Sequence, residues 1–270
     1  LFFRFFMGYI LLWIMNPHRL PIKSWKQELT FAGAGLTGMT LYYLMENIAL
    51  TYSQASNVGV IVSIAPVFTA ITAHIFLKEE GKLRPAFFMG CVIALIGISL
   101  ISFSGTTMHL NPIGDLLSVG GAIIWSFYSV LSKKIGSFGY SVVQETRRTF
   151  FYGILFMIPA LFIFDFKWDL IRFATPAYLF NIFYLGLGAS AICFVTWNMA
   201  VRILGAIKTS VYIYLAPVVT AVTSVIILHE KITFLSGLGI LLVVGGLLLS
   251  EQKKKFFSIR GRKQAENVIE

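Results

Sequence analysis

Long apolar runs alternate with short polar breaks along most of this chain of 270 residues. Proline, glycine or charged residues mark the breaks, and the runs between them predict nine helices. These helices cover residues 1–15, 28–50, 55–77, 83–104, 113–134, 148–164, 177–201, 206–228 and 233–250. Most of them are close to the roughly 20 residues that a helix needs to cross a hydrocarbon core. The pattern predicts an all-α, polytopic membrane protein.

The composition also indicates that a lipid bilayer surrounds the protein. Apolar residues make up 57% of the chain and charged residues only 13%, whereas soluble domains carry about 25% charged residues. A lipid bilayer is therefore an expected partner. The net charge of +10 would favour nucleic acid in a soluble protein, but the basic residues lie between apolar runs and in the tail 251–270, so nucleic acid is not expected as a partner.

Lysine and arginine fall unevenly on the two sides of the predicted helices. All but four of the 22 lie in one set of alternate connections, which includes the tail; the exceptions are Arg4, Lys167, Arg172 and Lys231. Basic connections stay on the cytoplasmic side. We therefore expect a multi-pass protein of the cell (inner or plasma) membrane with a cytoplasmic C-terminus. Nine helices then place residue 1 outside, which predicts a missing first helix.

The second half of the chain repeats the first at a constant offset. Asn47 falls on Asn198, and Glu79 falls on Glu230. Between these limits 13 of 33 positions are identical, where shared apolar composition alone gives about three. After a small shift, Gly90 and Gly97 fall on Gly239 and Gly246.

This repeat predicts the domain organisation. Counting the missing helix, each unit has five helices, and an odd number forces the second unit to enter the membrane in the opposite sense. The expected divisions are residues 1–106, residues 107–250 and the basic cytoplasmic tail 251–270. Inverted repeats are typical of transporters, because two pseudo-symmetric halves can alternate between inward-open and outward-open shapes.

The ordered motifs resemble one family. They are the paired helices with Ala65-Pro66 and Ala216-Pro217 that close at Glu79 and Glu230, the glycine-spaced terminal helices, and the segments 111–115 and 125–129. Together they resemble the ten-helix drug/metabolite transporter superfamily, specifically the EamA type. The resemblance implies ten helices, cytoplasmic termini, and export of small metabolites, amino acids or toxic compounds. It fixes no substrate, and the chain departs from it by lacking the first helix, which in the family helps to line the central cavity.

Two prolines lie near the middle of paired helices. Pro66 and Pro217 each remove a backbone donor and can bend the helix. Bends at matched positions near the midplane would provide gating points. A static packing kink is the alternative for both.

Polar residues in hydrocarbon need partners. Asn47 and Asn198 occupy equivalent positions, where interhelical hydrogen bonding is one interpretation and substrate contact the other. Glu46 is a carboxylate inside a predicted span, and Trp197 occupies the equivalent position in the second half of the repeat. Glu46 is therefore a candidate to carry a proton or to face a cationic substrate. The alternative is that Glu46 reaches interfacial water.

Aromatic and hydroxyl side chains complete the candidate set. They fall on helices that the resemblance places around the cavity, where rings and a few hydrogen-bonding groups suit small amphipathic solutes. The cavity candidates are Tyr43, Glu46, Asn47, Ser63, Trp125, Tyr128, Trp197, Asn198, Tyr212 and Tyr214. Packing against lipid is the alternative for any one of them.

No motif predicts a cofactor or a metal. Cys91 and Cys193 lie inside apolar runs without ligand spacing. Residues 33–38 fit the dinucleotide pattern G-x-G-x-x-G, but they follow no strand and lie within a predicted span, where small residues allow close helix packing. No phosphate loop, zinc-binding H-E-x-x-H motif or serine-nucleophile elbow is present.

Three functions fit a membrane protein of this kind. The first is a secondary transporter that exports small organic solutes by alternating access, with the proton as candidate coupling ion. The second is an intramembrane lipid-modifying enzyme, which would need several polar residues converging from different helices. The third is a non-transporting scaffold, which has no use for two-state symmetry. The inverted repeat favours the transporter.

Overall fold

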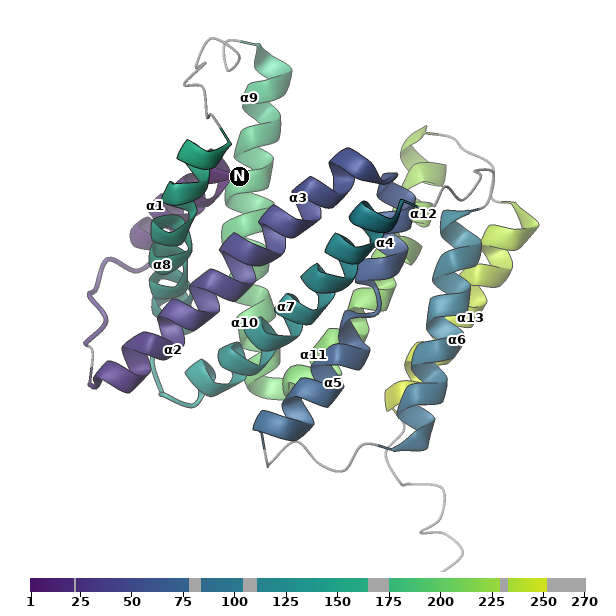
Figure 1. Cartoon of the computed structure of the whole chain (residues 1–270), viewed down its shortest axis with the longest axis horizontal. Helices are drawn as coiled ribbons and strands as arrows, with labels where there is room; N and C mark the ends of the chain where they lie inside the picture. The colour runs from purple at the N-terminus through teal and green to yellow at the C-terminus, as the bar shows by residue number, and fades with distance from the viewer. Residues whose placement is uncertain (22, 78–83, 104–110, 165–174, 229–232, 252–270) are drawn as a thin grey trace, which may run out of the picture. The chain divides into compact units, whose positions relative to one another are not determined.

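The computed structural model describes residues 1–21, 23–77, 84–103, 111–164, 175–228 and 233–251. Within these ranges the regular structure is helical, and helices occupy all nine predicted regions (Figure 1). The first half contains α1 (Phe2–Met15), α2 (Trp25–Gly35), η1 (Leu36–Leu41), α3 (Tyr42–Tyr52), α4 (Ala55–Val62), α5 (Ala65–Phe76) and α6 (Pro85–Ser102). The second half contains α7 (Pro112–Gly136), α8 (Val142–Ile163), α9 (Pro176–Phe183), η3 (Tyr184–Ile192), α10 (Cys193–Leu204), α11 (Ala206–Val211), η4 (Tyr212–Tyr214), α12 (Leu215–Leu228) and α13 (Phe234–Glu251).

The helices have the length and composition of membrane spans. In the described part of the chain, seven helical segments are long and apolar enough to cross a bilayer, and α1 is a shorter apolar helix. This confirms the all-α, polytopic membrane fold. Glu79, Glu230 and residues 252–270 of the basic tail lie outside the described residues.

The start of α8 differs most from the prediction. α8 begins at Val142, whereas the prediction began at residue 148 because the charged stretch before it was assigned to a connection. In the structure, Glu145 pairs with Arg202 of α10, and Arg148 pairs with Glu28 of α2. These partners come from distant parts of the sequence, so the charges are tolerated within a helix.

The helices form two compact units. Unit 1 comprises Leu1–Lys82 and Thr107–Ile213, and unit 2 comprises Leu83–Thr106 and Tyr214–Glu270. Each unit takes helices from both halves of the repeat, so the units are not the predicted divisions 1–106, 107–250 and 251–270. That division stays a prediction about the sequence repeat.

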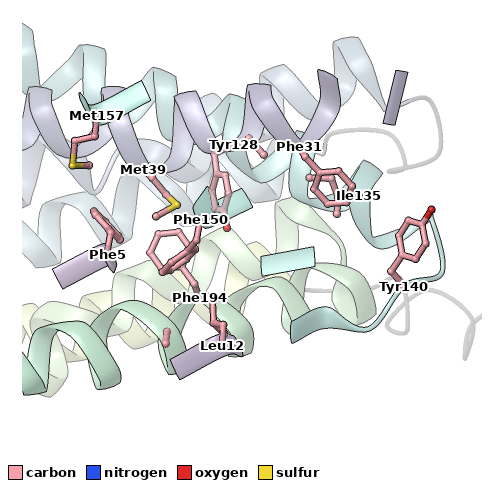
Figure 2. Packing of buried hydrophobic residues seen from close by; sticks show 12 residues of the cluster. Phe5, Leu12, Phe31, Met39, Tyr128, Ile135, Tyr140, Phe150, Met157 and Phe194 are labelled. Carbon is pink, nitrogen blue, oxygen red and sulfur yellow. The ribbon is translucent and has the colours of Figure 1, made fainter. Parts of the chain in front are cut away.

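Aromatic rings hold the core of unit 1 together (Figure 2). Phe5 of α1, Phe150 of α8 and Phe194 of α10 meet edge to face, with ring centroids 5.3 to 6.2 Å apart. Such pairs each contribute about 0.5–1.5 kcal/mol beyond their buried area. The three rings are fully or almost fully buried, so they fix α1 against both helices of the second half.

The first pair of repeated helices runs in opposite directions within unit 1. The connection between α7 and α8 carries Tyr140, whose hydroxyl lies 3.0 Å from Oε1 of Gln27 near the start of α2. The Tyr140 carbonyl accepts a hydrogen bond of 2.9 Å from Arg202 near the end of α10. The repeat pairs 28–50 with 177–201, so the start of one partner and the end of the other lie at the same place.

The helices α6 and α13 form an antiparallel pair in unit 2. They pack side by side through backbone contacts at glycines (Figure 1). Gly90 lies against Gly246, and Gly97 lies against Gly239. Because the repeat equates Gly90 with Gly239 and Gly97 with Gly246, these are two copies of one contact.

A helix break precedes each of the two matched prolines of the repeat. The turn at Ser63 and Ile64 separates α4 from α5, and the 3₁₀ turn η4 separates α11 from α12. A proline ring excludes the carbonyl four residues before it. That residue is Val62, the last of α4, for Pro66 and Ile213, inside η4, for Pro217.

The glycine-rich stretch 33–38 packs against other helices, as predicted. A Cβ at Gly35 would lie 2.6 Å from the Gly153 nitrogen of α8, and a Cβ at Gly38 would lie 2.2 Å from the Tyr128 ring. Only glycine allows these approaches. The helix-packing interpretation of this stretch is confirmed.

Candidate functional site

Six aromatic side chains from α3, α7 and α10 gather in unit 1. We call them the aromatic cluster: Tyr42, Tyr43, Trp125, Tyr128, Phe194 and Trp197. Trp125 is central, with ring centroids 4.8 Å from Tyr42, 5.0 Å from Tyr128 and 5.3 Å from Trp197. The structure therefore brings four of the predicted site residues together, from both halves of the chain.

Two indole groups of this cluster have free donors. The Nε1 atoms of Trp125 and Trp197 are buried and have no hydrogen-bond partner among the described residues. A buried N–H without an acceptor costs about 1–3 kcal/mol. Both groups can donate to a bound solute or to water, so they are the first indication of a binding site within the cluster.

An arginine missed by the sequence analysis lies beside the cluster. Arg4 was placed on the outer side within the predicted helix 1–15 and was not named as a cavity candidate; it lies in the first turn of α1. Its Nε donates a hydrogen bond of 2.7 Å to Oγ of Ser190, and its guanidinium lies 4.7 Å from the centre of the Tyr43 ring. The available signal was a single basic residue inside an otherwise apolar run.

Glu46 lies one helical turn beyond Tyr42 on α3. The Tyr42 hydroxyl donates a hydrogen bond of 3.1 Å to Oε1 of Glu46. Tyr42 and Tyr43 are themselves in edge contact, with centroids 4.9 Å apart. Glu46 and Arg4 therefore flank the same two tyrosine rings, one with negative and one with positive charge.

Matched helix irregularities precede these side chains. The π-helical segments η1 and η3 occupy equivalent places in the repeat, since Leu36–Leu41 corresponds to residues 187–192. Tyr42 follows η1 directly, and Cys193, the first residue of α10, follows η3. A π-helical turn holds an extra residue, so the residues after it point to a different side of the helix. Such turns are frequent at functional sites.

Asn198 joins three helices through a buried network. Its Oδ1 accepts hydrogen bonds from the Tyr128 hydroxyl at 2.8 Å and from Oγ of Ser132 at 2.7 Å. Its Nδ2 donates to Oγ1 of Thr146 on α8 at 2.9 Å. Both polar groups of the amide are thus bonded across helices, which is the structural interpretation of this residue.

The remaining candidates lie elsewhere. Asn47 is exposed and donates to the Tyr43 carbonyl of its own helix. Ser63 is buried and donates to the Gly59 carbonyl one turn earlier. Tyr212 is 41% exposed in η4, and Tyr214 is buried in unit 2. For these four residues, as for Pro66 and Pro217, a place in a substrate pathway stays a prediction.

No three metal-ligating side chains come together in the described ranges. The cluster combines aromatic faces, one cation, one carboxylate and two indole donors that have no partner in the described part of the chain. Such a set binds an amphipathic solute by stacking and by charge.

Comparison with known proteins gives the family. Residues 1–103 and 112–251 both match the EamA-like transporter family. The chain belongs to this family. EamA-like proteins are membrane transporters of small solutes and not enzymes, which confirms the resemblance drawn from the motifs.

Relatives of this EamA-like chain are named as transporters. It is 27% identical to an uncharacterized transporter of Archaeoglobus fulgidus over 94% of this chain and 87% of the relative. It is 28% identical to the uncharacterized transporter YvbV of Bacillus subtilis, over 92% of this chain and 80% of that protein. A probable terminal-alkyne amino-acid exporter of Streptantibioticus cattleyicolor is 26% identical, with 81% and 71% covered.

A solved crystal structure supports the EamA-like fold. It superposes with a TM-score of 0.72 over 93% of this chain and 86% of that chain, at 20% identity. At this identity the likeness concerns the fold alone.

Proposed function

We propose that this protein is a secondary transporter that exports small amphipathic solutes bearing a carboxylate, an ammonium group or both. The solute binds at the aromatic cluster. Arg4 faces the carboxylate and Glu46 faces the ammonium group, while the indole donors of Trp125 and Trp197 bind its polar atoms. The single observation that carries this proposal is the pair of buried indole N–H groups without acceptors, beside opposite charges.

Alternating access is the proposed mechanism. It is supported by the opposite directions of repeated helices in unit 1 and in unit 2, and by helix breaks at equivalent places before Pro66 and Pro217. Inverted repeats allow the two halves to exchange shapes around a site near the midplane. The two prolines are the proposed gating points.

The direction and the driving ion are also proposals. The exporter from Streptantibioticus cattleyicolor supports export and an amino-acid-like solute. Glu46 is the proposed proton carrier, because a carboxyl group in a span takes up and releases protons as its surroundings change. Export would then be driven by proton entry.

The proposed location is the cell membrane with a cytoplasmic C-terminus. Support comes from the end of unit 1 where α7 and α10 finish, since Lys133 donates a hydrogen bond of 3.0 Å to the Arg202 carbonyl there. Two basic residues of the second half, Lys133 and Arg202, therefore meet at this end. Basic ends stay in the cytoplasm.

Three probes of one shape test the binding proposal. L-Phenylalanine carries both charges, phenethylamine only the ammonium group, and 3-phenylpropionate only the carboxylate. A ligand of the folded state raises the unfolding temperature of the purified protein. We expect Arg4→Gln to reduce the stabilisation by 3-phenylpropionate selectively and Glu46→Gln to reduce the stabilisation by phenethylamine selectively. Lys134→Gln, at an exposed position, is the control for the loss of one charge.

Transport is measured in liposomes with an imposed pH gradient and radiolabelled L-phenylalanine. Glu46→Gln should remove the dependence of transport on the gradient. Unchanged coupling in this variant would exclude Glu46 as the proton carrier. Equal effects of Arg4→Gln and Lys134→Gln on all three probes would contradict the binding site.

A further inference from the structure

A second polar site lies at the C-terminal end of α1, and none of its lining residues belongs to the aromatic cluster. A cavity of about 420 Å³ opens between the end of α1, the residues that follow it and the start of α8. Its walls are made by eight side chains: Tyr9, Trp13, Arg19, Leu20, Gln144, Arg147, Arg148 and Phe151. Three of them are cations, of which Arg148 is paired with Glu28, and none is an anion.

Arg147 is a buried cation that has no carboxylate partner within the described ranges. The residue is 4% exposed, its guanidinium donates to the carbonyls of Asn16 and His18, and it lies 3.8 Å from the centre of the Trp13 ring. Carbonyls and a ring carry no net negative charge. Among the described residues, no ion pair involves Arg147.

The neighbouring carboxylates are already paired. Glu28 accepts from Arg148 and from the Tyr152 hydroxyl, and Glu145 accepts from Arg202. An isolated buried charge is strongly unfavourable unless an opposite charge compensates it. The cavity beside Arg147 is the available place for that charge, and Arg19 adds another cation to it.

We propose that this cavity binds the phosphate group of an anionic ligand. A guanidinium presents paired donors that match phosphate oxygens. The aromatic walls Tyr9, Trp13 and Phe151 favour a ligand with an apolar part, because such rings gather at the membrane interface. Phe151 is 39% exposed, so the wall of the cavity reaches the outer face of α8.

Two sources can supply the phosphate group. One is the headgroup of an anionic phospholipid, since basic pockets between membrane helices bind such headgroups. The other is a free phosphate ion. Both have the same chemistry at Arg147, and the chemistry of the wall rings predicts that the lipid binds more tightly.

The test uses the purified protein in an uncharged detergent. Its unfolding temperature is measured while dioctanoyl phosphatidylglycerol, dioctanoyl phosphatidylcholine or inorganic phosphate is added. Phosphatidylglycerol should raise the temperature in a saturable manner, and phosphatidylcholine should not. Saturation by inorganic phosphate at comparable concentration would identify the free ion as the source instead.

Variants separate this site from general attraction to a basic protein. Arg147→Gln should abolish the stabilisation, and Arg19→Gln, which changes an exposed residue and leaves the fold intact, should raise the half-saturating concentration by about twofold to fivefold. Arg19→Lys should restore much of the effect. Lys134→Gln removes the same charge from an exposed residue outside the cavity and should change nothing. Equal responses of Arg19→Gln and Lys134→Gln, or equal responses to all three additives, would overturn the proposal.

Discussion

Gly246 tests the packing of α13 against α6. A Cβ at this position would lie 2.5 Å from the Gly90 carbonyl oxygen and 2.6 Å from the Ala94 nitrogen. Both are backbone atoms, so no side-chain rotation relieves the clash. In Gly246→Ala the two helices must therefore separate by roughly 1 Å to reach ordinary contact distances.

The size of the effect follows from this separation. A gap of about 0.5–1 Å forfeits roughly a quarter to a half of the dispersion energy of each contacting atom pair. Overpacked substitutions in well-packed interiors cost about 1–3 kcal/mol. We expect Gly246→Ala to lower the free energy of unfolding by about 2 kcal/mol, which is roughly a 30-fold change in the unfolding equilibrium constant.

The neighbouring residue provides the control. Gly245 lies on the same helix, and a Cβ there would meet nothing within 4 Å. Because alanine favours helix more than glycine does, Gly245→Ala should leave stability unchanged or raise it by up to about 1 kcal/mol. Unfolding of both variants is followed by titration with sodium dodecyl sulfate in mixed micelles. Equal midpoints for the two variants would refute the proposed contact.

A double substitution tests the same reasoning further. Gly90 and Gly246 touch each other, so separation of the helices in one variant makes room for the second methyl group. The loss in Gly90→Ala/Gly246→Ala should be smaller than the two single losses added together, because contacting sites are coupled.

Two further predictions concern buried polar contacts in unit 1. Asn198→Leu removes three bonds between helices, worth about 0.6 kcal/mol each in a membrane, so it should cost about 2 kcal/mol. Asn47→Leu at the equivalent exposed position should cost under about 0.5 kcal/mol, and equal unfolding midpoints would contradict the network. Arg202→Met leaves the Glu145 carboxylate without its partner and should cost about 3–5 kcal/mol. Thermal unfolding is compared with exposed Lys134→Met, and the same midpoint for both would show that the pair is not required.

The sequence predicted the helices well because each depends on a local pattern. Apolar runs and their breaks located all nine helical regions. The start of α8 was wrong since Glu145 is paired with Arg202 from another helix, and no local pattern contains that partner. Arg4 was missed as a site residue for a similar reason, because its acceptor Ser190 lies in the second half of the chain.

The candidate site was predicted only in part. Four of the six aromatic members were predicted because rings on cavity-facing helices were sought, and Trp125, Tyr128 and Trp197 do meet. Tyr42 and Phe194 were missed. Nothing in the sequence distinguishes the two asparagines, yet one joins three helices and the other bonds only its own. The difference arises because Asn198 faces neighbouring helices and Asn47 is exposed. Tertiary packing decides this.

The two glycine contacts of unit 2 have a further consequence. Gly90 against Gly246 and Gly97 against Gly239 are the same contact made twice. A Cβ added at any of the four glycines would lie 2.5 or 2.6 Å from the carbonyl oxygen of the glycine opposite. Such reciprocity is the mark of an isologous interface, in which one surface patch recognises itself. One five-helix polypeptide inserted into the membrane in both orientations could therefore form this interface as a homodimer, and fusing two copies into one chain requires no new surface.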